Sequence, residues 1–460
     1  MKRNHFISLI GLIGLIGPIG PIGLISLICF MSPISLSAQK QWSLQECCDY
    51  AVSHNINIKQ RENLQRQREL QLSTAKNSRL PDLNASAGQN FSFGRGLTAE
   101  NTYSNTNTSS TSFSLGTSVP LFTGFQIPNQ IKLNQLNLEA AVADLEKAKN
   151  DICMQVAQAY VQILFNQEIA EVAHRQIDID SLQVNRLQAL VSNGKASGVE
   201  LSQQQATLAQ SRLTATQADN NLQLAILTLT QLLELPTPDG FAVVRPDLSG
   251  LSVQAGLSGV SPDAIYADAL TVKPEVRSAQ LAVTASERSI DIAKAGNYPT
   301  LSLSGGLGSN YYTTSGFPSD GFSKQIKNNF SQYIGLNLNI PIFNRYQTRN
   351  SIHSARIDRD NQLLALDNTK KTLYKEIQQV YYNTVAAEAK CTSSEQARQS
   401  ALTAFEQVQA KYENGKANST EFNESKNNYL RAESDLIQAR YELMYQVALI
   451  QFYRGSELTF

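Results

Sequence analysis

The sequence predicts an α+β protein made of two copies of one elongated unit, in which a pair of strands leads into a long antiparallel helical hairpin. Three observations support this fold class. Pro120-Leu121-Phe122 recurs as Pro341-Ile342-Phe343, 221 positions later. The 65 residues from Asn129 to Asn193 contain no glycine and no proline, which is typical of a helix. The segment before each long helix alternates apolar with small or polar residues, and this period of two indicates strands.

Composition limits the classes of protein to which the chain can belong. Its 460 residues carry 39 basic and 39 acidic side chains, and charged residues make up only 17% of the chain, against about 25% in soluble globular proteins. A neutral chain gives no electrostatic footprint for nucleic acid. The hydrophobic fraction of 42% excludes wholesale disorder. A mean hydropathy of -0.25 excludes a bundle of membrane-spanning helices.

Residues 1–38 have the order of a secretory signal peptide. Two basic residues precede an almost unbroken apolar run at 6–31, and Ser35-Leu36-Ser37-Ala38 suits cleavage before Gln39. An uncleaved membrane anchor is the alternative, because about 20 apolar residues can span a bilayer. The two prolines within the run favour the cleaved peptide, which leaves a chain with 37 basic and 39 acidic side chains.

The cysteines do not form a recognisable metal or redox motif. Lipid attachment at Cys29 is an alternative fate for the signal peptide, but the bulky Ile28 before it disfavours this. The sequence has no Cys-x-x-Cys spacing, and adjacent cysteines do not readily pair with each other. The four cysteines beyond the signal peptide are therefore predicted to be small buried hydrophobes: Cys47, Cys48, Cys153 and Cys391.

An internal duplication sets the domain organisation. The offset of 221 positions also relates Asn193-Gly194-Lys195-Ala196 to Asn414-Gly415-Lys416-Ala417, so register is kept over more than seventy residues, as a helix requires. A linker is expected at 237–262, where proline and glycine cluster and helical periodicity is lost. The predicted parts are repeat 1 at 39–236, with strand hairpin 82–122 and helical hairpin 129–235, and repeat 2 at 263–460, with strand hairpin 300–343 and helical hairpin 344–454.

Each repeat is expected to begin with a helix and to end in a helical hairpin. Residues 43–80 lack glycine and proline and read as one helix in repeat 1. In the longer helix that follows, apolar residues recur at three-, four- or seven-residue steps, which is coiled-coil spacing. Gly194 and Gly415 then mark turns after which a second helix folds back on the first.

The predicted strands have the length and alternation of membrane-spanning strands. Each has roughly the 9 to 11 residues that a tilted membrane strand needs, with one apolar face and one small or polar face. A half-buried soluble hairpin has the same alternation and is the alternative. Four strands cannot close a barrel, and open edges are not tolerated in lipid, so a membrane location requires several chains to share one barrel.

Two strand hairpins, each leading through Pro-Leu/Ile-Phe into a very long helix that turns back at a glycine, resemble the TolC-like outer-membrane efflux family. The resemblance runs from Trp42-Ser43-Leu44 to Tyr453-Arg454-Gly455. It implies a homotrimer whose twelve strands form one barrel in the outer membrane of a Gram-negative bacterium, and whose helices continue it as an α-barrel into the periplasm. The linker at 237–262 would be the family's equatorial segment. Expected partners are outer-membrane lipid, a periplasmic adaptor protein and an inner-membrane transporter, with no cofactor.

The resemblance also implies two adaptor-docking tips at the helical turns. They would consist of Asn193, Gly194 and Lys195 in the first repeat, and of Asn414, Gly415 and Lys416 in the second. The family typically has a Val-Gly pair at each tip. Asn193 and Asn414 occupy the valine positions here, so the adaptor's identity is open.

A periplasmic gate is implied by acidic residues that follow each tip. The family's constricting acids correspond to Glu200, Glu421 and Glu424, and a latching tyrosine corresponds to Tyr412. The arginine that would complete the latch is Ala417. Capping is the alternative role, because Ser197 with Glu200 has the spacing of a capping box, and Asn418 with Glu421 is a near version of one.

No enzymatic chemistry is predicted. Glu171 and His174 have the spacing of a di-iron ligand pair, but the second repeat offers no counterpart. No Ser/His/Asp or Cys/His arrangement can be assembled, and no metal site is expected. The predicted function is a passive channel of a tripartite efflux or type I secretion system, and the alternative is a periplasmic coiled-coil adaptor or scaffold. The cargo and the class of pump cannot be deduced from the sequence.

Overall fold

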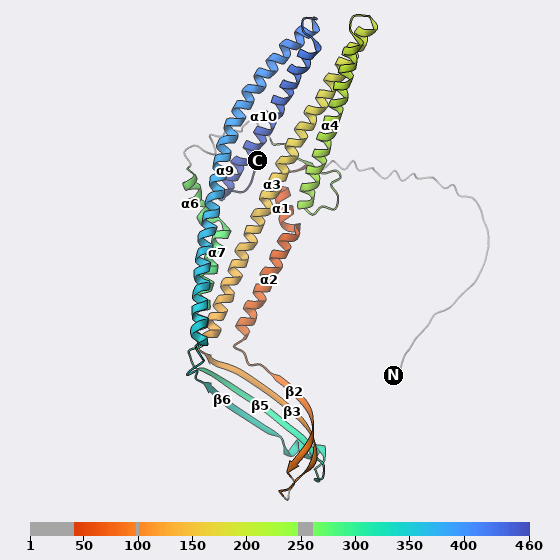
Figure 1. The fold of residues 1–460 in the computed structure, drawn as a ribbon. Helices are drawn as coiled ribbons and strands as arrows, with labels where there is room; N and C mark the ends of the chain where they lie inside the picture. Colours follow the sequence, from red (N-terminus) through yellow and green to blue (C-terminus); the bar gives the residue numbers. More distant parts are fainter. Residues whose placement is uncertain (1–40, 98–100, 247–260) are drawn as a thin grey trace, which may run out of the picture. The chain divides into compact units, whose positions relative to one another are not determined.

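The structure, a computed structural model, describes residues 41–97, 101–246 and 261–460 (Figure 1). The predicted signal peptide and residues 247–260 of the predicted linker lie outside the described residues. In chain order the elements are β1 (Gln41–Trp42), α1 (Leu44–His54), α2 (Ile56–Asn77), β2 (Asn84–Leu97), β3 (Tyr103–Thr123), α3 (Gln126–Ser192), α4 (Gly198–Leu232), β4 (Ala242–Val243), α6 (Pro262–Val272), α7 (Pro274–Ala295), β5 (Thr300–Thr314), α8 (Phe322–Asn328), β6 (Ser331–Asn339), α9 (Gln347–Glu413) and α10 (Ser419–Tyr453).

The duplication is kept to the residue in the long helices. α3 and α9 each have 67 residues, and α4 and α10 each have 35. At 1.5 Å per residue, α3 and α9 are each about 100 Å long. The first half of α3 packs against α1 and α2 and its second half against α4, while α9 packs in the same way against α6 and α7 and then α10. Figure 1 shows the α3–α4 and α9–α10 hairpins with their turns at the same end.

A tight corner joins each strand hairpin to its long helix. Phe125 and Tyr346, the residues just before α3 and α9, both adopt left-handed backbone angles, with φ of 68° and 62°. Each ring packs edge-on against the phenylalanine of the preceding Pro-Leu/Ile-Phe motif. A left-handed conformation costs a residue with a Cβ about 1–2 kcal/mol. Its repetition at the same place in both copies indicates that the corner geometry is required by the fold.

The single helix predicted at 43–80 is wrong, because α1 and α2 are separated at Asn55. This residue is extended, with φ -60° and ψ 133°, and its side chain accepts a hydrogen bond from the Asn57 amide to cap α2. Its side-chain amide also donates to the Leu232 carbonyl at the end of α4, at 3.0 Å. The break therefore allows α2 to begin where α4 ends, and the two helices follow one another along α3.

The second repeat has an equivalent junction at Lys273, between α6 and α7. The Lys273 ammonium donates to the Phe452 carbonyl at the end of α10, at 3.3 Å, and lies 3.7 Å from the centre of the Phe452 ring. A positive charge at a helix C-terminus is favourable. Burial nevertheless lowers the pKa of Lys273 to about 8, because removal from water disfavours the charged form.

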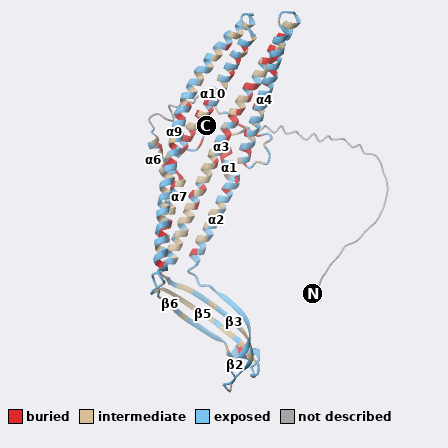
Figure 2. Ribbon diagram, in the orientation of Figure 1, coloured by how far each residue is buried: buried red, intermediate tan, exposed pale blue. Residues whose placement is uncertain are grey.

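The largest hydrophobic cluster lies where α1, α3 and the ends of α4 and α10 meet β4. Cys47 and Cys48 are buried in it, as predicted, whereas Cys153 and Cys391 are only partly buried. β1 pairs in parallel with β4, and the Tyr160 hydroxyl lies 2.6 Å from the Val244 carbonyl oxygen just beyond it. Figure 2 shows that buried residues are concentrated in the helices, whereas the sheet is largely exposed.

The other sheet has four antiparallel strands in the order β2-β3-β5-β6. Paired residues share a face, and Leu115 pairs with Leu307 while Leu303 pairs with Leu336. One face is therefore apolar, and it is open to the surroundings, with Ile334 86% and Leu336 68% exposed. The opposite face carries small or polar residues: Ser114, Gly116, Ser304, Gly306, Gly308 and Gly335.

The second strand hairpin differs from its prediction in two respects. The return strand β6 ends at Asn339, so Ile340 and Ile342 lie beyond it, although their alternation continued the strand pattern. The seven-residue helix α8 lies between β5 and β6 and was not predicted. β6 consequently pairs only with residues 300–308 of β5, which leaves the rest of β5 next to α8.

Candidate functional site

The two helical turns have the same hydrogen-bond pattern. In the first, the Gly194 amide donates to the Val191 carbonyl and the Lys195 amide to the Leu190 carbonyl. This is a Schellman motif, which places a left-handed residue just past the helix, and Gly194 has φ 68°. The second turn repeats the pattern around Gly415, at φ 70°. The predicted tip residues of both turns are exposed.

The asparagines at the valine positions have a local role in these turns. Asn193 donates from its side-chain amide to the Ala189 carbonyl, and Asn414 does the same to Ala410, each at 2.7 Å. Each bond adds to the one that the backbone amide of the same asparagine donates to that carbonyl, at 3.3 Å, and so reinforces the helix end. The two tips are thus built alike, although they belong to different repeats.

Tyr412 lies between the two hairpins, near their tips. Its ring stacks on Phe422 of α10 at 4.9 Å, and the Arg186 guanidinium of α3 lies 5.3 Å from the ring centre. Arg186 also donates to the Glu413 carbonyl at 3.0 Å. Burial raises the pKa of Tyr412, the Arg186 guanidinium opposes this rise, and the Glu200 carboxylate adds a smaller increase. Arg186 thus links α3 to the end of α9 near the tips.

The capping roles of the acidic residues are the reverse of those expected. Ser197 accepts from the Val199 amide, and Glu200 does not complete the capping box that its spacing predicts. The complete box is at the second tip, where the Glu421 amide donates to Asn418 at 2.8 Å and the Asn418 amide donates to the Glu421 carboxylate at 3.4 Å. Glu424 is exposed one turn further along α10.

A buried ion pair joins the two hairpins. The Lys426 ammonium of α10 contacts the Asp180 carboxylate of α3, and both side chains are 0% exposed. Asp180 also accepts from Gln204 at 3.1 Å and from Ser211 at 2.6 Å, both on α4. Asn423 of α10 donates to Gln204 at 3.2 Å. We call these five residues the inter-hairpin cluster.

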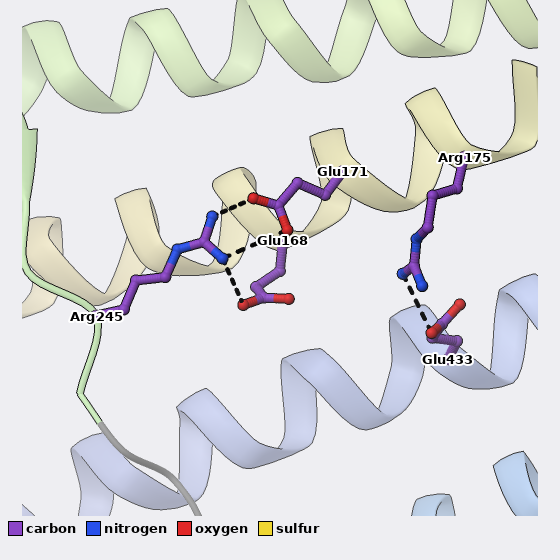
Figure 3. Close-up of polar contacts among 5 residues, drawn as sticks. All are labelled: Glu168, Glu171, Arg175, Arg245 and Glu433. Carbon is purple, nitrogen blue, oxygen red and sulfur yellow. Dashed lines mark hydrogen bonds and ion pairs between the residues drawn. The ribbon is translucent and has the colours of Figure 1, made fainter. Parts of the chain in front are cut away.

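Further ion pairs lie along α3, and one of them joins the two hairpins (Figure 3). Arg175 of α3 donates to Glu433 of α10 at 3.2 Å. Arg245, which follows β4, points back to α3 and pairs with Glu168 and Glu171. The hydrogen bond to Glu171 raises the pKa of Arg245 above its ordinary value. Polar pairs thus join α10 to α3 on the tip side of the hydrophobic cluster in which the end of α10 also packs against α3.

The inter-hairpin cluster was missed by sequence reasoning, although a signal was present. Lys426 lies between Phe422 and Leu430, four positions from each, and all three are buried on one face of α10. A lysine in an apolar stripe of this spacing requires a partner, because an unpaired buried charge is costly. The partner could not be identified, since Asp180 lies 246 positions earlier in the chain.

Within the described residues, no group of histidine, cysteine or acidic side chains is placed to hold a metal ion. Glu171 is occupied by Arg245, and His174 pairs with Asp219 at 3.0 Å. Over the same part of the chain, no helix combines the length and apolar character needed to cross a membrane.

Comparison with known proteins identifies the family. The family model of outer membrane efflux proteins matches residues 49–234 and 265–455, which include both helical hairpins. The chain belongs to the outer membrane efflux protein family. As a member of this family it is located in the outer membrane and extends into the periplasm.

Two relatives carry names that refer to resistance or export. The fusaric acid resistance protein FusA of Burkholderia cepacia is 32% identical over 239 residues, or 50% of this chain and 43% of FusA. The pyoverdine export outer membrane protein OpmQ of Pseudomonas aeruginosa is 25% identical over 316 residues, or 66% of this chain and 60% of OpmQ. The matches therefore span about half the length of these relatives.

Solved structures of the family have the same fold. The CmeC outer membrane channel of Campylobacter jejuni superposes with a TM-score of 0.76 at 19% identity, covering 91% of this chain and 87% of CmeC. The outer membrane protein VceC of Vibrio cholerae gives a TM-score of 0.72 at 18% identity, covering 90% and 96%. Each likeness covers at least 90% of this chain.

Proposed function

We propose that three copies of this chain form the outer-membrane channel-tunnel of a tripartite efflux or type I secretion system. The channel passively conducts substrates delivered by an inner-membrane transporter and a periplasmic adaptor. The observation that carries the proposal is the four-stranded sheet, which has one exposed apolar face and, at each edge, a strand that is paired on one side only.

The sheet edges provide the argument for assembly. Among the described residues, β2 and β6 each have one strand partner, and an open edge in lipid leaves backbone groups without hydrogen bonds. Pairing β6 of one copy with β2 of the next satisfies both edges. Three copies give twelve strands, which close into a barrel with the apolar face towards lipid and the small, polar face towards the lumen.

The long helices would continue the barrel as a tunnel. α3 and α9 are each about 100 Å long, and both start directly at a strand corner. Twelve helical segments from three copies would then surround one lumen. The tips, with Asn193 to Lys195 and Asn414 to Lys416, would be the part furthest from the membrane and would contact the adaptor.

Gating is proposed at the tips, where the second hairpin would move relative to the first. α3 and α10 make the main contact between the hairpins, and near the tips this contact consists of the inter-hairpin cluster and Arg186. Separation of the hairpins would return both buried charges of the cluster to water, and their hydration would offset much of the lost attraction. Glu200, Glu421 and Glu424 from three copies would form an acidic collar that repels itself and attracts cations.

The experiment that tests the proposal combines subunit mass with conductance. The protein purified in mild detergent should have the mass of a trimer and should form discrete channels in planar bilayers. A monomer without conductance refutes the proposal. Recovery of the protein from the soluble periplasm would instead support the adaptor or scaffold alternative, which the family assignment disfavours.

A matched pair of variants tests which face of the sheet meets lipid. Leu336→Arg places a charge on the apolar face, whereas Asn337→Arg places the same charge on the opposite face one residue later. An arginine facing lipid near the bilayer centre costs about 2–4 kcal/mol. We expect only the first variant to reduce the amount of trimer inserted in the outer membrane, and equal insertion of both would refute the assignment.

A further inference from the structure

The unpredicted helix α8 is anchored to the apolar face of the sheet. The Phe322 ring lies 5.2 Å from the Tyr311 ring and 6.5 Å from the Phe113 ring, edge-on in both cases. Phe113 and Tyr311 lie on the same face as Leu115 and Leu307, because successive odd-numbered residues of each strand share a face and Leu115 pairs with Leu307. α8 therefore lies against the apolar face and not the polar one.

Gln325 fixes α8 to the edge of β5. Its buried side chain accepts from the Tyr312 amide at 3.0 Å and donates to the Tyr312 carbonyl at 2.9 Å. These are the two bonds that a neighbouring strand would make, at a level of β5 that β6 does not reach. Asn329 adds a bond to the Asn310 carbonyl at 2.7 Å. The helix is thus held in one orientation.

Two lysines occupy the opposite side of α8. At about 100° per residue, Lys324 and Lys327 point roughly 200° and 140° away from Phe322. Both are exposed. Lys324 pairs with Asp320 at 2.8 Å, and no carboxylate contacts Lys327 within the described residues. The helix therefore has an aromatic side on the sheet and a basic side away from it.

The same end of the sheet carries a third basic group. Arg95 is two residues before the end of β2, on the same face as Phe91 and Phe93 by alternation. Its guanidinium lies 5.8 Å from the centre of the ring of Tyr103, the first residue of β3. Basic groups beside aromatic rings at one end of an apolar face are typical of the boundary between lipid tails and headgroups.

We infer that α8 and the end of β2 bind the phosphate groups of lipids in the outer leaflet of the outer membrane, through Lys324, Lys327 and Arg95. The inference rests on the proposed function, because the apolar face must lie in lipid. α8 is at the end of the sheet far from the helices (Figure 1), and the helices extend into the periplasm, so this end is at the outer surface. Anionic headgroups there complement the exposed basic side of α8.

The experiment measures lipid retention by the intact trimer. Wild-type protein and the Lys324→Gln, Lys327→Gln double variant are exchanged into detergent with lipid A, and bound lipid is counted by native mass spectrometry. Two basic groups near an anionic lipid surface contribute roughly a 30-fold change in binding. We expect that loss in the double variant and a comparable loss when wild-type protein is given dephosphorylated lipid A.

The control removes two lysines that lie at the other end of the molecule. Lys195→Gln with Lys416→Gln changes the helical tips, and lipid A retention should equal that of the wild type. Equal retention by the Lys324/Lys327 variant, or retention that does not depend on the lipid phosphates, overturns the inference. Trimer mass and conductance are recorded on the same samples, so a failure of lipid binding in an intact channel refutes this inference and leaves the proposed function standing.

Discussion

Removing one partner of the buried ion pair should weaken the contact between the hairpins more than any surface change. The variants are Asp180→Asn, Lys426→Met and the two combined. In Asp180→Asn the Lys426 ammonium stays fully buried without a negative partner. In Lys426→Met the carboxylate stays buried but keeps the hydrogen bonds from Gln204 and Ser211, so the smaller loss is expected there.

The magnitude follows from burial. Both side chains are 0% exposed, and breaking a buried pair by removing one partner costs about 3–5 kcal/mol. The double variant removes both charges and leaves a neutral amide at position 180, so we expect it within about 1–2 kcal/mol of the wild type. The double variant should therefore lose less stability than the sum of the two single variants. A general loss of packing would instead make the two losses add.

Two measurements check the prediction. Thermal unfolding of the detergent-solubilised protein reports stability, and single-channel recording reports the open fraction. If opening separates the hairpins, destabilising the closed contact raises the ratio of open to closed channels tenfold for each 1.4 kcal/mol that the contact loses. We therefore expect at least a tenfold rise for Asp180→Asn and a much smaller one for the double variant.

The control is the exposed pair of Lys390 and Glu442, which lies within the second hairpin at 2.8 Å. Lys390→Met should cost about 0–1 kcal/mol and leave the open fraction unchanged. The reasoning is refuted if Asp180→Asn lowers the melting temperature without changing the open fraction, because the pair would then stabilise the closed and open states equally.

Three further predictions concern other positions. Burial lowers the pKa of Lys273 from 10.5 to about 8. Between these pH values the unfolded chain therefore binds more protons than the folded protein. The stability of the wild type relative to Lys273→Gln should consequently rise with pH from 8 to 10.5. Arg345, which precedes Tyr346 at the second corner, is also left-handed with φ 54°, so Arg345→Gly should raise the melting temperature by relieving about 1 kcal/mol of strain. Gly124→Ala at the equivalent corner should lower it, because the new Cβ would lie 2.8 Å from a backbone carbonyl oxygen. Glu424→Ala should enlarge the closed-state current. Glu421→Ala should also cost about 0.5–1 kcal/mol of helix stability, because it removes the bond from the Asn418 amide but keeps the bond from its own amide to the Asn418 side chain.

Each of these predictions has a contradicting result. A constant stability difference from pH 8 to 10.5 would exclude Lys273 as the titrating group. A melting temperature for Arg345→Gly at or below that of the wild type would show that the corner is not strained there. An unchanged closed-state current in Glu424→Ala and in the double variant with Glu421→Ala would restrict these acids to structural roles.

The long helices could be predicted closely because their sequence signals are local. The absence of glycine and proline defines the helix interiors, and Gly194 ends α3 because the turn needs a left-handed residue. The break at Asn55 gave no such signal, since asparagine also occurs inside helices. It is explained by a contact with Leu232, 177 positions away. α8 was missed for the same reason, because contacts with β5 decide its conformation.

The candidate site was predictable only in its local part. The tip residues are where the repeated Asn-Gly motif placed them. The roles of Glu200 and Glu421 could not be separated by spacing, since both acids are three positions after a capping residue and only Glu421 returns the second bond. The pairing of Asp180 with Lys426 depends on how two hairpins from different repeats lie against each other, which no local pattern encodes.

The equal lengths of the two helical hairpins constrain how the protein can change in evolution. One residue inserted in α3 would turn its apolar stripe by about 100° and shift its tip by about 1.5 Å relative to α9. Seven residues are close to two full turns and so nearly restore the stripe. A viable change of length therefore has to be about seven residues. It has to occur in both helices of one hairpin and again in both helices of the other. Homologues with longer or shorter tunnels should differ from this chain by such coordinated steps at four places.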